Sequence, residues 1–411
     1  MFKKISWKNI LMFLAILGPG LITANVDNDA GGIATYSIAG AEYGYGFLWS
    51  ILPVTIVLII MQEMSVRMGA VTGKGLADLI RERFGLKITF YFMLALFVTN
   101  IGNVVAEFAG VASSLGIFGV SKYISVPLSA LFVWILVVKG SYKSVEKIFL
   151  VACLFYVAYP LSGYLANPNW HEVGIAMVSP SVQWDSAWFY MLVGIVGTSV
   201  APWMQFYLQS AVVEKGVDAE HYRHSRLDVI IGCVMASVVI FFIVLACAAT
   251  LHPVGIHVDD AADAALALRP FAGKYASMLF SFGLLNASVF AASILPLSTA
   301  YTICEGLGFE TGVNKTFKEA PQFYGLYTAI IIIGALSVLW PKFPFFLIML
   351  FSQVLNGVLL PFVLFFMLKL INNREIMGEY VNSRKMNIIS WSSAVIIMVL
   401  SLVMVVLAFI Q

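Results

Sequence analysis

Apolar residues run along this chain in long blocks that are separated by short polar or Gly/Pro breaks. Each block has roughly 20 residues or more, the length that an α-helix needs to cross the hydrocarbon core of a bilayer. We therefore predict an all-α, polytopic membrane protein. The blocks predict eleven membrane-spanning helices near residues 10–41, 46–66, 88–118, 122–138, 148–166, 187–213, 227–251, 271–303, 323–340, 343–368 and 387–410.

Composition agrees with this pattern. Of the 411 residues, 61% are hydrophobic and 11% are charged, and the mean hydropathy is +0.92. Soluble domains have about 25% charged residues, so a soluble globule is excluded. The four cysteines lie in apolar segments without a paired spacing, which predicts neither a disulfide framework nor a structural zinc site. They are Cys153, Cys233, Cys247 and Cys304.

The basic residues are distributed unevenly between the predicted loops. With the N-terminus in the cytoplasm, 20 of the 24 Lys and Arg residues fall on the cytoplasmic side. Loss of one predicted span would reverse every later loop, so this bias supports both the number of spans and an orientation with the C-terminus outside. We expect a prokaryotic plasma membrane. The four basic residues on the outer side are Lys122, Arg269, Lys274 and Lys342.

The first span contains acids where a membrane helix should be apolar. Residues 18–47 read GPGLITANVDNDAGGIATYSIAGAEYGYGF, with Asp27, Asn28 and Asp29 followed by Gly31 and Gly32. An acid near the membrane midplane costs about 2.5–3.5 kcal/mol, which indicates a functional site. A helix broken here would expose carbonyls and a carboxylate that can bind a cation. The alternatives are a solvated helix end, or Asp27 and Asn28 either as outer-shell ligands holding water or as caps of the first half-helix.

The sixth span has a matching interruption. It reads MLVGIVGTSVAPWMQFYLQSAVVEKG, with Thr198 and Ser199 just before Pro202, and a proline inside a helix removes a hydrogen bond and kinks or unwinds it. Interrupted helices at corresponding positions of two halves are typical of transporters built from inverted repeats. We predict one transporter domain over 1–386, with repeats over about 10–166 and 187–370, and a peripheral eleventh helix over 387–411.

These segments resemble the Nramp family of divalent-metal transporters, which has a LeuT-like fold of 5+5 inverted repeats. The likeness includes MGAVTGKGLADL, VVAEFAGVA, GTSVAPW and SQVLNGVLLPF. The resemblance implies metal ligands at Asp29, at the main-chain carbonyl of Thr198 and at Gln353. The family also binds metal through an Asn and a Met, and the aligned residues here are Gly32 and Ala201.

Both departures favour a hard ion. Thioether sulfur prefers soft metals, whereas Mg²⁺ prefers oxygen and loses its waters reluctantly. Loss of the Met removes a soft ligand, and Gly32 and Ala201 would leave room for a partly hydrated ion. The pattern resembles the Nramp-related magnesium transporters, and we expect transport of Mg²⁺ and also of Mn²⁺ by alternating access.

The family's proton route is incomplete in this chain. The third span keeps Glu107 but has Val104 at the position of an Asp, and Trp203 replaces a His. We therefore expect uncoupled transport driven by the membrane potential, which supplies about 2 × 2.3 kcal/mol for a divalent ion at 100 mV.

Other polar residues have structural explanations. We assign Gln353 to the site and Asn356 to hydrogen bonding between helices. Glu107 is either a remnant of a proton path or a structural hydrogen-bond partner, and we favour the second. We expect a polar network at the inner end of the second span and a solvated basic loop around two histidines; these residues are Gln62, Glu63, Arg67, His221 and His224.

The sequence predicts no enzyme, because it contains no nucleophile–base pair, phosphate loop or Cys/His cage. We expect no cofactor apart from the transported ion, no nucleic-acid partner, contact with membrane lipid, and a monomer. Three alternatives stay open: a proton-coupled Mn²⁺/Fe²⁺ transporter, a sodium-coupled amino acid transporter of the same fold, and a membrane-embedded enzyme or signalling protein with a polar cavity.

Overall fold

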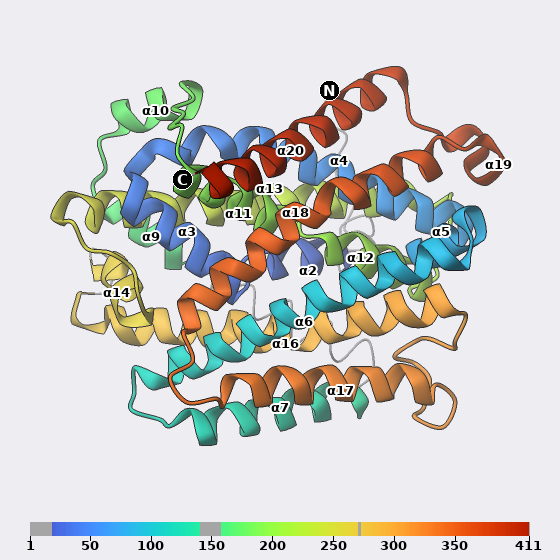
Figure 1. Cartoon of the computed structure of the whole chain (residues 1–411), viewed down its shortest axis with the longest axis horizontal. Coiled ribbons are helices and arrows are strands. Elements are labelled where there is room, and N and C mark those ends of the chain that lie inside the picture. Colours follow the sequence, from blue (N-terminus) through green and yellow to red (C-terminus); the bar gives the residue numbers. More distant parts are fainter. Residues whose placement is uncertain (1–18, 140–157, 270–272, 411) are drawn as a thin grey trace, which may run out of the picture.

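The computed structural model describes residues 19–139, 158–269 and 273–410, and the regular structure within these ranges is helical (Figure 1). In this part of the chain, eight helical stretches are long and apolar enough to cross a membrane. The all-α prediction is confirmed. The predicted first and fifth spans, 10–41 and 148–166, lie partly outside the described residues.

The first half contains two short helices in series, two long spans and the shorter helix α7. Its helices are α2 (Pro19–Val26), α3 (Ala30–Tyr43), η1 (Gly44–Phe47), α4 (Leu48–Thr72), α5 (Leu76–Phe84), α6 (Leu86–Gly116), α7 (Lys122–Val138), α9 (Ala158–Leu165) and α10 (Trp170–Val178).

The second half repeats the pair of short helices in series and then continues with long spans. Its helices are α11 (Ser186–Ser199), α12 (Pro202–Glu214), α13 (Tyr222–Thr250), η3 (His252–Val254), α14 (Ala261–Ala265), η4 (Leu266–Leu268), η5 (Gly273–Tyr275), α16 (Ala276–Leu307), α17 (Pro321–Val338), α18 (Phe345–Ile371), α19 (Arg374–Met377), η6 (Gly378–Tyr380) and α20 (Arg384–Ile410). Both predicted interruptions are present, between α2 and α3 and between α11 and α12.

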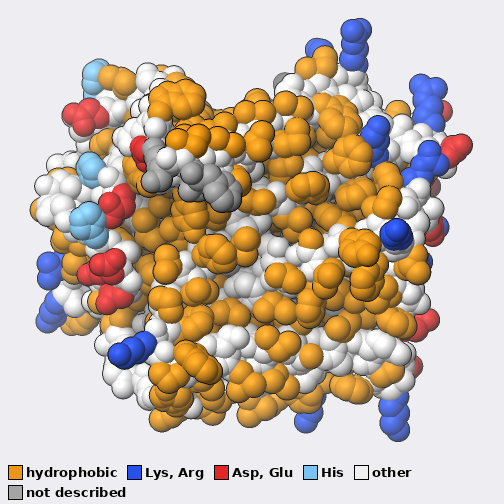
Figure 2. All heavy atoms as spheres, viewed as in Figure 1, with side chains coloured by type: hydrophobic (Ala, Val, Ile, Leu, Met, Phe, Trp, Pro, Cys, Tyr) orange, Lys and Arg blue, Asp and Glu red, His pale blue; other side chains and the backbone are white. Residues whose placement is uncertain are grey.

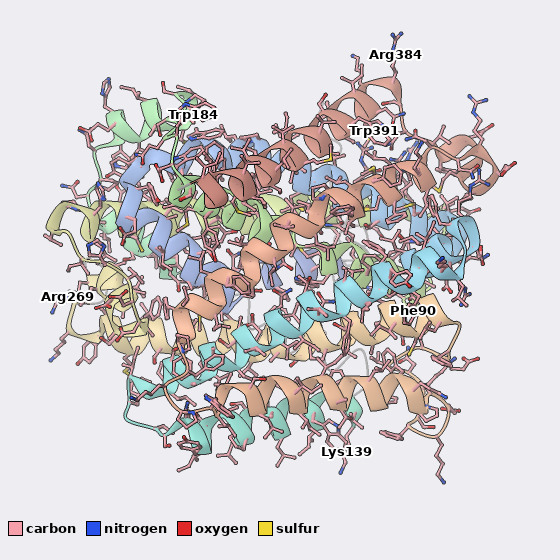
Figure 3. All side chains as sticks on the ribbon, viewed as in Figure 1. Phe90, Lys139, Trp184, Arg269, Arg384 and Trp391 are labelled. Carbon is pink, nitrogen blue, oxygen red and sulfur yellow. The ribbon has the colours of Figure 1, made fainter. Side chains whose placement is uncertain are left out.

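The surface is divided as a membrane protein requires. Figure 2 shows hydrophobic side chains across the middle of the visible face and most charged side chains at its left and right ends. Arg269 lies at the left end of the molecule and Trp184 in its upper left part, and Arg384 and Phe90 lie towards the right (Figure 3). The horizontal axis of the figures is therefore close to the direction in which the helices cross the bilayer.

Glycines let the central helices touch through their backbones. A Cβ at Gly197 of α11 would lie 2.0 Å from the carbonyl oxygen of Gln353 in α18, and one at Gly357 of α18 would lie 2.4 Å from the carbonyl oxygen of Val193. Such contacts are typical of helix packing in membranes, where no hydrophobic effect drives helices together and small residues allow close van der Waals packing of the backbones. The consequence is that α18 lies directly against the second interruption.

The helix α20 lies at the periphery of the bundle (Figure 1). It packs on α18, α11 and α4, and only 22% of its most apolar stretch is buried inside the protein. Many of its large side chains therefore remain on the outer surface, as expected for a helix that faces lipid.

Candidate ion-binding site

The first interruption is held open by the side chain of Asp29. The helix α2 ends at Val26, and Asp29 is the N-cap of α3, where its Oδ1 accepts a hydrogen bond of 2.6 Å from the backbone N–H of Gly32. An N-cap carboxylate satisfies a free N–H group and interacts favourably with the positive end of the helix dipole. Asp29 therefore caps α3, the second half-helix, and this role was not predicted from the sequence.

Glu107 of α6 supports the same interruption from outside. Its Oε2 accepts a hydrogen bond of 3.2 Å from the backbone N–H of Ala30. The approach depends on Gly110, because a Cβ there would lie 2.5 Å from the Cβ of Ala30. The hydrogen bond to Ala30 supports the structural role that we favoured for Glu107 from the sequence.

Asp27 brings a second carboxylate to the interruption. Its side chain is 1% exposed, and neither carboxylate oxygen has a hydrogen-bond partner among the described residues. Asp29 is 4% exposed, and neither acid forms an ion pair within the described ranges. Two buried carboxylates beside each other repel and are poorly solvated, which is costly unless a cation joins them.

The second interruption meets the first one. The helix α11 ends at Ser199, Val200 leaves helical geometry with φ −132° and ψ 54°, and Pro202 begins α12 at a position where proline is well tolerated. A Cβ at Gly32 would lie 2.7 Å from the carbonyl oxygen of Asp27 and 3.1 Å from Oγ1 of Thr198. Gly32 therefore allows the two interrupted segments to come into contact.

A hydrogen bond joins the two interrupted helices directly. The hydroxyl groups of Tyr36 in α3 and Ser199 in α11 lie 2.8 Å apart, and both residues are buried. Tyr36 was not predicted as part of the site. The available signal was its position seven residues after Asp29, two helical turns further along the same face.

Gln353 of α18 closes the third side. A Cβ at Gly31 would lie 1.9 Å from Nε2 of Gln353, so the amide lies against the backbone of the first interruption. Its Oε1 accepts a hydrogen bond of 2.8 Å from Asn356, whose amide also exchanges hydrogen bonds of 3.0 Å with Asn103 of α6. Asn356 thus connects helices, and it also orients Gln353.

The structure brings together most of the residues that the sequence selected. Asp27, Asn28, Asp29, Gly32 and Thr198 meet at the two interruptions with Gln353 beside them, and all are buried; Ala201, also buried, is the N-cap of α12. Their assignment as ion ligands stays a prediction.

The other polar candidates lie elsewhere. Glu63 and Arg67 form a buried ion pair of 3.1 Å, and Arg67 also binds the carbonyl of Tyr380, which confirms a polar network at that end of α4. Gln62 instead contacts the sulfur of Met204 at 3.9 Å. His221 is exposed and pairs with Asp218.

A further acid, at the far end of α2 from the interruption, escaped the sequence analysis. Oδ2 of Asp228 in α13 accepts a hydrogen bond of 2.8 Å from the backbone N–H of Gly20 in α2. The two residues are 208 positions apart in the sequence. No local pattern could therefore have predicted that α13 holds the beginning of α2.

Two helices interrupted at corresponding places, with their breaks in contact, define a membrane transporter of the LeuT-like fold. The chain belongs to the Nramp family, because the model described as "Natural resistance-associated macrophage protein-like" matches residues 20–407. Membership in this family makes the chain a transporter and not an enzyme.

Related proteins agree with this assignment. The chain is 28% identical to the divalent metal cation transporter MntH of Deinococcus radiodurans, over 96% of this chain and 90% of that protein. The fold is similar to that of the manganese transporter of Eremococcus coleocola, with a TM-score of 0.75, 21% identity, and coverage of 98% of this chain and 88% of the other. It is also similar to Mhp1, a nucleobase-cation-symport-1 family transporter, with a TM-score of 0.58, 15% identity, and coverage of 94% and 90%.

Proposed function

We propose that this protein carries divalent metal ions, Mg²⁺ and also Mn²⁺, across a bacterial plasma membrane by alternating access. The observation that carries the proposal is the pair of buried acids Asp27 and Asp29 at the contact of two interrupted helices. A divalent cation there would neutralise both carboxylates. The names of the relatives, which refer to divalent metal and to manganese, support a metal as the cargo.

The groups around the two acids favour a hard ion. Thr198 contributes a hydroxyl and a main-chain carbonyl at the end of α11, and Ala201 has no sulfur. Gln353 would contribute its amide oxygen by turning its amide, since in the structure its Nε2 faces Gly31 and its Oε1 accepts the hydrogen bond of Asn356. The sulfur of Met204, three residues further on, faces Gln62 of α4. Oxygen ligands of this kind suit Mg²⁺ and Mn²⁺ better than soft metals.

We propose that the ion keeps part of its water shell. Within the described residues, no group of three or more His, Cys, Asp or Glu side chains could hold a metal ion. Two acids and a few neutral oxygens are too few to replace the six ligands of Mg²⁺, which usually keeps several waters. Incomplete ligation also suits a cargo, which must be released on the other side.

We propose that transport is not coupled to protons. Glu107 is engaged with the backbone N–H of Ala30, and the two neighbouring positions of the family's proton route are the apolar Val104 and Trp203, both buried. The membrane potential alone would then drive accumulation of the ion. Orientation with the N-terminus inside, the division into repeats at 10–166 and 187–370, and a monomeric state belong to the same proposal.

The decisive experiment compares two Asp→Asn variants in proteoliposomes. Asp29→Asn removes the charge but keeps an oxygen that can accept the hydrogen bond from Gly32, so the cap and the fold should survive. Asp185→Asn is the matched control, because Asp185 caps α11 by accepting a hydrogen bond of 2.9 Å from Trp188 at the far end of that helix.

We expect Asp29→Asn to reduce Mg²⁺ and Mn²⁺ uptake by at least about 100-fold, or about 2.7 kcal/mol, and Asp185→Asn to change it less than twofold. Thermal unfolding of both variants should stay close to that of the unmodified protein. Uptake near the normal rate in Asp29→Asn would contradict the site.

Competition and pH measurements test the cargo and the coupling. Excess Mg²⁺ should suppress Mn²⁺ uptake, and a pH-sensitive dye inside the vesicles should report no acidification during Mn²⁺ influx. Mn²⁺ uptake that excess Mg²⁺ does not suppress would favour a proton-coupled Mn²⁺/Fe²⁺ transporter instead. Acidification that persists in an ionophore control would favour the same alternative.

A further inference from the structure

A cavity of about 230 Å³ lies between α4, α11 and α20, away from the ion site. Its walls are apolar almost throughout. Pro53, Val54 and Val57 line it from α4; Leu192 and Val196 line it from α11, with Val200 just beyond its end; and Ser393, Ile396, Ile397 and Leu400 line it from α20. The cavity is partly open, and two of its lining residues, Pro53 of α4 and Ile396 of α20, are exposed at the surface of the membrane-spanning region.

The position of the cavity matches one leaflet of a bilayer. Trp49 is the second residue of α4 and follows the connection η1, where the chain turns between two spans. Between Leu192 and Val200 the cavity follows the chain for eight residues, which corresponds to about 12 Å along a helix. Half of a hydrocarbon core is about 15 Å thick. The cavity therefore reaches from the edge of the membrane nearly to its centre.

One polar atom at the edge of this cavity lacks a partner. Nε1 of Trp49 is inaccessible to solvent and donates no hydrogen bond to any described residue. A buried N–H group needs an acceptor. Tryptophan at the end of a membrane helix lies at the depth of the lipid head groups and ester groups, where its ring is apolar and its N–H finds an oxygen. The hydroxyl of the adjacent Ser50 donates to the carbonyl of Phe47 and is not paired with this N–H group.

We propose that this cavity binds one acyl chain of a membrane glycerophospholipid, and that the indole of Trp49 turns to donate its N–H group to the ester carbonyl of that lipid. The chain lies along α4 and α11 under the cover of α20, and its end contacts Val200. Since Val200 is the residue at which α11 leaves helical geometry, the bound lipid packs directly against the second interruption. The role of α20 is then to form the third wall of a lipid site, which gives the eleventh helix a function beyond the repeats.

A cavity-filling variant with a matched control tests the proposal. Ser393→Trp places a large side chain into the cavity, whereas Val395→Trp places the same side chain on the outer surface of α20, where Val395 is 50% exposed. Both full-length proteins are purified in mild detergent after exposure to phosphatidylglycerol vesicles that contain a phospholipid with a photoactivatable group at mid-chain. Retained lipid is counted by native mass spectrometry, and the crosslinked residues are mapped by peptide sequencing.

We expect the unmodified protein and Val395→Trp to retain one phospholipid per chain, with crosslinks at residues of α4 and α11 that line the cavity. Ser393→Trp should reduce retention and these crosslinks at least fivefold. Trp49→Phe, a small change that leaves the fold intact, should reduce retention severalfold, because it removes the N–H group and keeps the ring.

Three results would overturn the proposal. One is equal lipid retention in Ser393→Trp, Trp49→Phe and the control. Another is a set of crosslinks spread evenly over the exposed side chains of α20, which would indicate ordinary lipid around the protein. The third is a crosslink between two protein chains through the cavity, which would show that a second copy covers it. None of these measurements depends on ion uptake, so their outcome is independent of the proposed transport function.

Discussion

The two interrupted helices differ in where their charge lies. The break between α2 and α3 carries two buried acids, and one of them caps α3, whereas the break between α11 and α12 has a neutral hydroxyl at Thr198 and a proline at the start of its second half. Under the proposed function, the first break would supply electrostatic attraction for the ion, and the second would supply neutral oxygens. We infer that affinity for a divalent ion depends on the first break and that discrimination between ions depends on the second.

The largest effect is expected from a side chain that disrupts the contact between the two breaks. Gly32→Ala puts a methyl group 2.7 Å from the carbonyl oxygen of Asp27 in the same break and 3.1 Å from Oγ1 of Thr198 in the other break, and such overpacking costs about 1–3 kcal/mol of unfolding free energy. We expect uptake to be lost. Gly102→Ala in α6 is the control, since its Cβ would meet nothing closer than 3.7 Å and alanine is the better helix former. Normal uptake by Gly32→Ala would show that the breaks need not touch.

Adding a side-chain ligand at the second break should change selectivity. Ala201→Met adds a thioether beside the end of α11, and soft sulfur favours Cd²⁺ over Mg²⁺. We expect Cd²⁺ to inhibit Mn²⁺ uptake about tenfold more strongly, a difference of about 1.4 kcal/mol, and Mg²⁺ to inhibit less. Inhibition constants in proteoliposomes measure both. Parallel changes for the two ions would mean that the side chain at 201 does not face the ion.

A smaller effect is expected when the hydroxyl of Thr198 is removed. Thr198→Val keeps the main-chain carbonyl, which is the group we assign to the ion, so uptake should fall only about threefold, or about 0.7 kcal/mol. Initial uptake rates under matched vesicle loading give this number. A loss as large as that of Asp29→Asn would show that side chains of both breaks contribute equally to ion transport, and would contradict the proposed difference between them.

The smallest effect concerns the far ends of the two interrupted helices. Near the end of α3, the carboxylate of Glu42 accepts a hydrogen bond from the ring of His257, which raises the pKa of His257 above its usual value. At the far end of α11, Asp185 caps the helix instead. Because the pKa is raised in the folded state, the contact contributes fully below the ordinary pKa of histidine and is lost as the pH rises through the raised pKa.

Nuclear magnetic resonance titration of His257 can check this pair. Glu42→Gln should lower the pKa of His257 towards its ordinary value, and Asp185→Asn should leave it unchanged. The contact is exposed, so the effect on unfolding should be close to the limit of detection. An unchanged pKa of His257 in Glu42→Gln would show that Glu42 does not form an ion pair with His257.

Much of the site was predictable, because broken membrane helices leave a strong local signal. Acids beside glycines in one span and a proline after Thr198 and Ser199 in another gave the two interruptions, and both are present. Gln353 was predictable as a polar side chain in an apolar run. The contacts of Glu107 with Ala30, of Asp228 with Gly20 and of Tyr36 with Ser199 were not, since each joins residues at least 77 positions apart.

The sequence by itself determined the class of the molecule. Hydropathy, loop charge and the spacing of the two interruptions are properties of single segments, and a bilayer allows such segments few alternatives to spanning helices. Only the tertiary structure decided that Gly31, Gly32 and Gly197 serve to bring the breaks and α18 into contact, and that Asp29 caps α3 while Asp27 has no partner among the described residues. Those facts depend on distances between helices that are remote along the chain, and such distances are fixed by packing rather than by any local pattern.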